Sequence, residues 1–176
     1  MLNRVLLFFI LFISFFSFSD DDIVNKEDVM RRGINIFYNS NDFVGNGRKV
    51  DSNSYGVEGY SGIPIPYDMF LNFGLKVEFF DFLNNDPVYF LFTQLVKEFN
   101  VNDRLVPYIH AGIDTSTNTK ERSFNVFLGV GLDIPLNDSL SFNLALNYHY
   151  RNWYNLPSDI SELSDSGLGV TVGLVF

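Results

Sequence analysis

The sequence predicts an all-β fold, an eight-stranded antiparallel up-and-down transmembrane β-barrel. From Arg31 to Phe176, apolar and polar residues alternate with a period of two, and Gly, Pro, Asn and Asp interrupt this pattern at intervals. Most of the strands that this pattern predicts have about 10 to 13 residues, roughly twice the common length in soluble sheets. A strand of about 10 residues tilted near 40° covers about 25 Å, the height of the apolar band of a barrel that crosses a membrane.

Eight strands are expected in chain order, each bounded by turn-forming residues. They are Arg31–Ser40, Ser52–Ile63, Met69–Phe80, Pro87–Phe99, Arg104–Thr115, Arg122–Ile134, Ser139–Arg151 and Gly167–Phe176. The connections suggest two different ends: tight turns at Gly62–Asp68, Asn100–Asp103 and Pro135–Asp138, and longer polar loops at Asn41–Asp51, Ser116–Glu121 and Asn152–Ser166. Only the brief linker Asp81–Asp86 departs from this alternation. With a periplasmic N-terminus, the longer loops would lie outside the cell.

The two faces of the strands differ in chemistry. In Met69–Phe80, one face carries Leu71, Phe73, Leu75, Val77 and Phe79, and the other carries Asn72, Gly74, Lys76, Glu78 and Phe80. The last three strands show the same division. A soluble barrel would bury the apolar face rather than the mixed one, so we expect the apolar face to meet lipid and the other to line the lumen. The fourth strand is apolar on both faces over Val88–Phe92, which leaves its register open.

The lumen is predicted to hold ionisable side chains that pair with one another and plug the barrel, because unpaired charges in a confined interior are costly. The predicted cluster consists of Lys76, Glu78, His110, Asp133, His149 and Arg151. Glu78 and Arg151 both fall toward the loops and are expected to be partners, whereas Asp133 falls near the turns and needs another. The interior of an eight-stranded barrel is only wide enough for side chains to fill it. Inward glycines at 129, 131, 169 and 173 are nevertheless expected to leave some space.

Aromatic residues cluster near the loop end of the seventh strand. Tyr148, Tyr150, Trp153 and Tyr154 are expected to form a girdle at the membrane–water interface.

The N-terminus predicts export. Residues 1–19 combine Arg4, an apolar run from Val5 to Phe16 and small residues at Ser17 and Ser19, as in a secretory signal peptide. A membrane-anchoring helix is the alternative, but Val5–Phe18 is only about 14 residues long, shorter than the roughly 20 that span a bilayer. We expect residues 1–19 to be a signal peptide, 20–30 a short periplasmic segment and 31–176 the outer-membrane barrel.

Composition excludes several classes of function. The chain has 176 residues, 47% of them apolar and 17% aromatic, with 21 acidic and 12 basic residues and a formal charge of -9. This acidic balance argues against nucleic-acid binding, which needs cations to neutralise phosphates. The absence of Cys excludes disulfides, thiol catalysis and thiolate metal sites.

Three segments carry a family resemblance: Leu105–Ile113, Phe127–Asp133 and the ending Gly169–Phe176. They resemble the small outer-membrane β-barrel superfamily, which includes the transmembrane domain of outer-membrane protein A, outer-membrane protein X and the opacity-type proteins. The resemblance implies that Phe176 is an assembly signal read by the outer-membrane assembly machinery, with periplasmic chaperones escorting the chain. It also implies location in the outer membrane of a Gram-negative-type bacterium, in contact with lipid and lipopolysaccharide. We expect a monomer.

The sequence favours a structural or surface-interaction role over two alternatives. The first alternative is a narrow channel or a conduit for hydrophobic solutes. The second is a lipid A-modifying enzyme, since small lipid A deacylases are similar barrels that use a His, a Ser two residues later and an acidic partner. Here the residue two positions after His149 is Arg151, which cannot attack an ester. We predict no catalytic residue, cofactor site or metal site.

Overall fold

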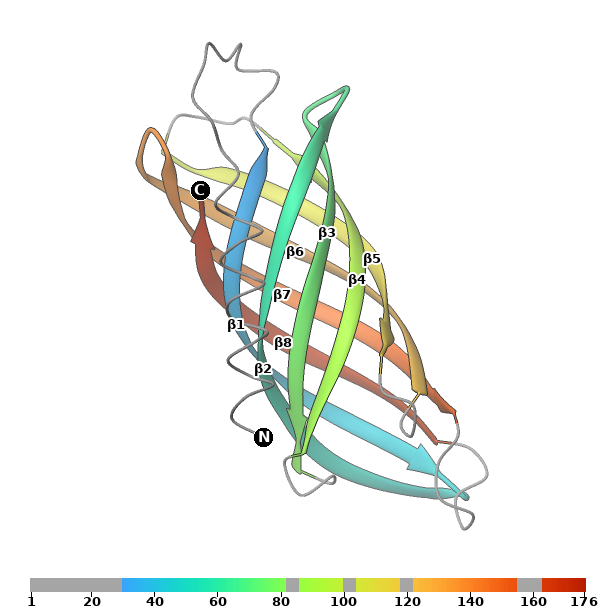
Figure 1. The fold of residues 1–176 in the computed structure, drawn as a ribbon. Coiled ribbons are helices and arrows are strands. Elements are labelled where there is room, and N and C mark those ends of the chain that lie inside the picture. Colours follow the sequence, from blue (N-terminus) through green and yellow to red (C-terminus); the bar gives the residue numbers. More distant parts are fainter. Residues whose placement is uncertain (1–29, 82–85, 100–103, 118–121, 155–162) are drawn as a thin grey trace.

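A computed structural model describes residues 30–81, 86–99, 104–117, 122–154 and 163–176. Eight antiparallel strands form a closed barrel in chain order (Figure 1). Their bounds are β1 Arg31–Gly45, β2 Arg48–Ile65, β3 Met69–Phe80, β4 Pro87–Glu98, β5 Val106–Ser116, β6 Arg122–Asn137, β7 Leu140–Tyr154 and β8 Leu163–Val175. The predicted signal peptide, residues 1–19, lies outside the described residues. None of the described residues belongs to a helix long and apolar enough to cross a membrane.

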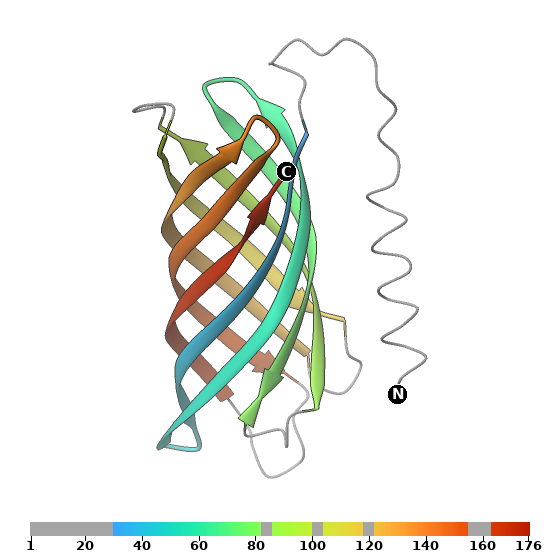
Figure 2. The same cartoon turned by 90° about the vertical axis from the view of Figure 1, so that its left-hand side faces the viewer.

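The barrel closes where the first strand meets the last. β1 pairs with β8 from Gly33–Val175 to Gly45–Leu163. Beyond this ladder, the backbone N–H groups of Arg32 and Phe176 each donate to the other residue's carbonyl oxygen, at 3.0 and 2.9 Å. Every strand therefore has a partner on both sides, as a spanning sheet requires in lipid. Figure 2 shows the strands inclined to the barrel axis.

The two ends of the barrel are named by their connections. The loop end carries the β1–β2, β3–β4, β5–β6 and β7–β8 connections, and the turn end carries the other three together with Arg31 and Phe176. The connections differ less in length between the two ends than predicted, since β4 and β5 are joined at the turn end by residues 99–105.

The long loop predicted over Asn41–Asp51 is wrong. β1 continues to Gly45 and β2 begins at Arg48, so only Asn46 and Gly47 form the turn. Their φ angles are 51° and 73°, as in the Asn-Gly turn that joins hairpin strands in two residues. The polar residues of the expected loop therefore form a hairpin extension, which projects beyond the neighbouring strands at the lower end of Figure 2.

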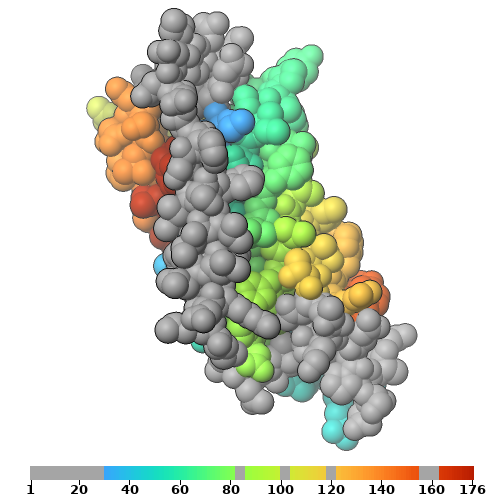
Figure 3. Space-filling model, viewed as in Figure 1, coloured from blue at the N-terminus to red at the C-terminus, as the bar shows by residue number. Residues whose placement is uncertain are grey.

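The outer surface of the barrel is apolar on every strand. Ile36, Leu128, Leu146 and Leu168 are between 59% and 69% exposed, and other large apolar side chains accompany them around the wall. Side chains of neighbouring strands lie against one another on the visible face (Figure 3). An exposed apolar surface of this extent would be unfavourable in water, and it identifies the lipid-facing side.

The structure settles the register of β4. Val88, Phe90, Phe92 and Val96 face inward and are at most 6% exposed, whereas the alternate residues, among them Leu91, face outward. Both faces of β4 are apolar because its inner face packs into apolar clusters inside the barrel, so the alternation that marks the other strands is lost.

Inward glycines lie opposite bulky inward side chains on the neighbouring strand. Five such cross-strand pairs join a glycine to an aromatic ring: Gly33–Tyr60, Gly56–Phe37, Gly74–Phe92, Gly112–Phe127 and Gly131–Tyr108. A Cβ atom at each glycine would overlap the ring that lies over it. Gly129, Gly169 and Gly173 are covered in the same way by His110, Asn39 and Asn35. The expected space at the inward glycines is therefore filled, and the glycines admit side chains rather than leaving an opening.

Candidate functional site in the barrel interior

Arg151 of β7 is the centre of the interior network in the loop half. It is 1% exposed, and its Nη2 donates to Oε2 of Glu78 on β3 at 2.8 Å. The guanidinium also lies 4.9 to 5.4 Å from the ring centroids of Phe80, Phe90 and Trp153. Cations over aromatic faces are stabilised by the ring quadrupole, so Arg151 is held both by charge and by the rings around it.

Glu78 also accepts hydrogen bonds from two further strands, β1 and β2. Its Oε1 accepts from Oγ of Ser54 at 2.6 Å and from Nδ2 of Asn39 at 3.1 Å. Lys76, on the same strand, lies 3.5 Å from Glu78 and donates to Oδ2 of Asp114 at 2.6 Å. Glu78 and Asp114 are 0% and 2% exposed, and hydrogen bonds with cations are what make such buried carboxylates tolerable.

Asp165 of β8 completes the loop half of the network. Its Oδ1 accepts from Nε1 of Trp153 at 2.6 Å, and Nε2 of His149 lies 3.1 Å from its Oδ2. Arg151 Nη1 lies 3.9 Å from the same Oδ2. The Asp165 carboxylate thus joins three side chains of β7.

Trp153 does not belong to the aromatic girdle, and its predicted place there is wrong. It is 4% exposed and faces inward with His149 and Arg151, because all three occupy odd positions of β7, whereas Tyr148, Tyr150 and Tyr154 occupy even positions. These tyrosines are 45%, 45% and 52% exposed on the outer wall.

An apolar cluster covers the network toward the loop end. Phe43, Phe80, Val88, Phe90 and Trp153 pack together, with Leu163 against them. Phe80 meets Trp153 edge to face, with ring centroids 5.2 Å apart. The cluster separates the ion pairs beneath it from the loop end of the barrel.

A second network lies in the turn half, around Arg31 of β1. Its guanidinium pairs with Glu98 and donates from Nη2 to Oδ2 of Asp133 at 2.6 Å. Asn143 Nδ2 donates to Oδ1 of Asp133 at 2.6 Å and lies 2.7 Å from the hydroxyl oxygen of Tyr108. Arg31 therefore links β1 to β4 and β6 across the interior.

His110 belongs to neither network. Its Nε2 lies 2.7 Å from Oδ1 of Asn147, whose Nδ2 donates to Oγ1 of Thr171 at 2.8 Å. Because the Asn147 amide nitrogen is used as a donor, its oxygen accepts, and the hydrogen-bond pattern assigns the proton to Nε2 of His110.

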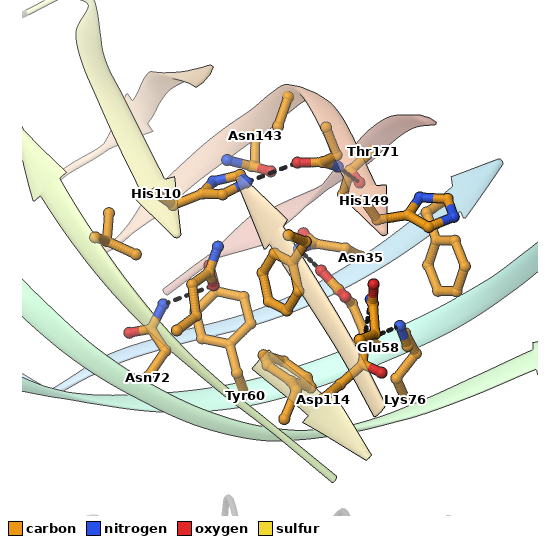
Figure 4. A pocket seen from close by; sticks show the side chains of 18 of the residues that line it. Asn35, Glu58, Tyr60, Asn72, Lys76, His110, Asp114, Asn143, His149 and Thr171 are labelled. Atoms are coloured by element: carbon orange, nitrogen blue, oxygen red, sulfur yellow. Dashed lines mark hydrogen bonds and ion pairs between the residues drawn. The ribbon is translucent and has the colours of Figure 1, made fainter. Parts of the chain in front are cut away.

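A cavity of about 60 Å³ lies between the two networks (Figure 4). Polar side chains from several strands surround it, among them Asn35, Glu58, Asn72, His110 and Asp114. A space of this size holds a few water molecules. Arg31 and Arg151, which are both buried, line it as well.

The six residues predicted for the lumen all lie inside the barrel, at most 8% exposed. The structure brings Lys76, Glu78 and Arg151 together and places Asp133 apart, with Arg31. Arg31, Glu58, Glu98, Asp114 and Asp165 also face the interior and were not predicted from the sequence. Their positions in the alternation could have revealed them: Asp114 shares the parity of His110 on β5, and Asp165 shares that of Gly167 on β8.

Among the described residues, no group of three or more His, Asp and Glu side chains is arranged to hold a metal ion.

Comparison with known proteins identifies the fold. No protein-family model matches the sequence, and no curated protein matches it significantly. Solved structures do match. A de novo designed transmembrane β-barrel is 18% identical with a TM-score of 0.53, over 88% of this chain and 98% of the design. Neisserial surface protein A is 11% identical with a TM-score of 0.54, over 81% of this chain and 95% of that protein. The resemblance to the small outer-membrane β-barrels is thus confirmed at the level of the fold.

Proposed function

We propose that this chain is a small integral outer-membrane barrel whose interior is closed and whose role is structural or surface-interacting. The observation that carries the proposal is the filling of the interior: two buried networks around Arg31 and Arg151, with an apolar cluster over the latter. The fold and the exposed apolar wall support integration in an outer membrane. The barrel would then act through its surfaces rather than through its lumen.

A narrow channel or a conduit for hydrophobic solutes is the alternative. It would need a continuous passage, but rings and amides cover the inward glycines and the cavity of about 60 Å³ lies between two ion-paired groups. Planar-bilayer recordings of the folded protein test this directly. We expect no stable conductance, and a stable open pore in the wild-type protein would overturn the closed-barrel proposal.

A lipid A-modifying activity gains little support from the interior. His149 does lie 3.1 Å from a carboxylate, Asp165, but both are buried and Arg151 stands where that chemistry needs a serine. We expect the mass spectrum of lipid A to be unchanged after incubation with the folded protein. Loss of an acyl chain would contradict a non-enzymatic role.

Orientation can be tested with single cysteines, because the sequence contains none. Lys49 lies in the exposed hairpin at the loop end, and Asp138 lies in the exposed β6–β7 turn at the other end. We expect a membrane-impermeant maleimide to label Lys49→Cys in intact cells and Asp138→Cys only after the outer membrane is opened. The reverse pattern would place the hairpin in the periplasm.

Phe176 is proposed to carry assembly information beyond its contact with lipid. It is 42% exposed, and Leu174 on the same outward face is 43% exposed, so the two form a matched pair. We expect Phe176→Ala to lower the yield of folded protein in the outer membrane several-fold more than Leu174→Ala does. Equal yields for the two variants would remove the special role. Accumulation of Phe176→Ala on periplasmic chaperones would support it.

A further inference from the structure

Aromatic side chains gather on the outer wall near the loop end. Tyr38 of β1 lies opposite Tyr55 of β2, which lies opposite Phe79 of β3. The rings of Tyr55 and Phe79 are stacked, with centroids 5.5 Å apart. On β7, Tyr148 and Tyr150 also face outward. Rings of this kind collect where lipid meets water, so these five residues indicate the level of the membrane surface at the loop end.

Beyond these rings the outer wall differs between the two sides of the barrel. On β1 and β8, the next outward side chains toward the loop end are polar or acidic: Ser40, Asp42, Ser164 and Ser166. On β6 and β7, they are Arg122, Asn152 and Tyr154. The β6–β7 side therefore presents a cation and hydrogen-bond donors at the level where the membrane surface lies.

Arg122 is an exposed cation on the lipid-facing side of β6. No side chain among the described residues pairs with its guanidinium, whereas Lys49 Nζ in the hairpin lies 2.9 Å from Oδ2 of Asp42. An arginine near the end of a membrane strand is tolerated because its long side chain reaches the headgroup layer. Phosphate oxygens in that layer are the anions that its planar set of donors fits best.

Two side chains of β7 accompany the guanidinium. Tyr154 lies directly opposite Arg122 in the β6–β7 register, and Asn152 lies opposite Phe124, the next outward residue of β6. The Asn152 side chain is half-buried on the outer wall and has no hydrogen-bond partner in the described part of the chain. The register thus places a guanidinium, an amide and a hydroxyl on the same part of the wall, and all three are donors to a phosphate group.

An apolar surface runs from these donors toward the middle of the membrane. It consists of residues between 41% and 59% exposed: Phe124, Val126 and Leu128 on β6 and Leu146, Tyr148 and Tyr150 on β7. Val126 lies opposite Tyr150 and Leu128 opposite Tyr148, so the two strands present one continuous face. A lipid whose acyl chains lie below a phosphate-bearing headgroup matches both parts of this surface.

We propose that the β6–β7 face binds lipid A. A phosphate group is held by Arg122, Asn152 and Tyr154, and acyl chains lie against the apolar surface below. Lipid A carries phosphate groups and several acyl chains on one disaccharide, and it forms the outer leaflet of outer membranes. Its negative charge complements Arg122, whereas the polar and acidic wall of β1 and β8 offers no such attraction. This inference rests on the orientation proposed above, with the loop end outside the cell.

Native mass spectrometry of the folded barrel, released from detergent micelles, tests the proposal. The probe is bisphosphorylated lipid A, compared with the same lipid after removal of its phosphates and with phosphatidylglycerol. We expect saturable binding of lipid A, about tenfold tighter than that of the dephosphorylated form, because charged hydrogen bonds are lost with the phosphates. Equal binding of the two forms would reject the phosphate site. Phosphatidylglycerol binding as tight as that of lipid A would reject lipid A as the specific occupant.

Arg122→Gln removes the cation, and Arg48→Gln is its matched control. Arg48 is also exposed and without a partner among the described side chains, but it lies in the projecting hairpin rather than on the wall. We expect Arg122→Gln to weaken lipid A binding about tenfold and Arg48→Gln to leave it unchanged. Arg122→Lys should retain part of the affinity, because an ammonium binds phosphate as a point charge without the paired donors of a guanidinium.

Two results with these variants would overturn the proposal: undiminished lipid A binding in Arg122→Gln, or an equal loss in Arg48→Gln, which would indicate a general attraction between charges. Asn152→Leu provides a second decision, because it removes a donor without changing the charge. We expect a smaller loss than in Arg122→Gln, and unchanged binding would reject the site. Binding to the purified barrel does not depend on its orientation in cells, so a reversed maleimide pattern together with intact lipid A binding would contradict the orientation alone.

Discussion

Each half of the interior contains one buried arginine, but the surroundings of the two arginines differ. In the loop half, Arg151 and Glu78 are 1% and 0% exposed and lie beneath the aromatic cluster. In the turn half, Arg31 pairs with Asp133 and with Glu98, whose side chain is 19% exposed, and Phe70 and Tyr108 are the rings against its guanidinium. The ion pair of the loop half is therefore more deeply buried than the pairs of the turn half, where Glu98 is in contact with water.

This difference indicates in which half the loss of one partner of an ion pair lowers stability most. A charge left alone in a dry interior cannot regain its hydration, so breaking a fully buried pair costs far more than the pair contributes when intact. Where water can enter, it replaces part of the lost hydrogen bonding. We therefore expect the loop half to respond more strongly to the loss of its arginine than the turn half.

The largest effect is expected from Arg151→Ala. It leaves Glu78 without its guanidinium partner and opens a space beneath Phe80, Phe90 and Trp153. We expect the free energy of unfolding to fall by about 3 to 5 kcal/mol, measured by urea titration of the barrel in lipid vesicles. Planar bilayers should show brief ion conductance that the wild type lacks.

A double variant sharpens the interpretation of that loss. Arg151→Met with Glu78→Gln removes both charges and keeps bulk under the aromatic cluster. Since a buried ion pair can often be replaced by uncharged residues at little cost, we expect the double variant to be more stable than Arg151→Ala. A double variant as unstable as Arg151→Ala would show that the charges themselves specify the packing of the loop half.

Arg31→Ala is expected to have a smaller effect on the turn half. Asp133 keeps the hydrogen bond from Asn143 at 2.6 Å, and Glu98 can turn toward water at the turn end. We expect a loss of about 2 kcal/mol in the same urea titration. A loss equal to or larger than that of Arg151→Ala would break the comparison between the halves.

Gly131→Ala separates packing from charge in the turn half. A Cβ at position 131 would overlap the ring of Tyr108, which lies over this glycine and beside Arg31. Overpacking of this kind costs about 1 kcal/mol or somewhat more, and we expect the unfolding midpoint in urea to fall accordingly. Adding Tyr108→Leu should recover part of the loss. No recovery would mean that Gly131 is needed for the backbone rather than for the ring.

The wall of the barrel was predictable from the sequence, and most of the interior partners were not. Alternation placed Lys76, Glu78, His149 and Arg151 on the inner face. A strand with one apolar and one polar face can lie in lipid only with its apolar face outward. The same alternation assigns Trp153 inward, but the grouping of neighbouring aromatics suggested an interface girdle. Parity is the stronger signal, since a strand cannot turn a single side chain to the other face.

Partners across the barrel depend on closure and register, which no single strand contains. Lys76 of β3 reaches over β4 to donate to Asp114 of β5. The inward residue of β4 that lies opposite Lys76 is Phe90, and the Lys76 ammonium is 4.6 Å from the centroid of the Phe90 ring. The register of β4 could not be chosen from a segment apolar on both faces. Asn-Gly is a sequence typical of a two-residue hairpin turn, but the polar residues on both sides of Asn46-Gly47 favoured a loop over the strands that the structure has there.

The smallest effect is expected from Lys49→Ala, outside both halves of the interior. Lys49 Nζ lies 2.9 Å from Oδ2 of Asp42 across the β1–β2 hairpin, but these side chains are 59% and 50% exposed. Water and salt screen such a pair, and holding two mobile side chains together offsets much of their attraction. We expect no measurable change in the urea midpoint at any salt concentration, and no conductance. A loss comparable with that of Arg31→Ala would show that the projecting hairpin stabilises the barrel. The contribution of an ion pair to stability would then not depend mainly on how deeply the pair is buried.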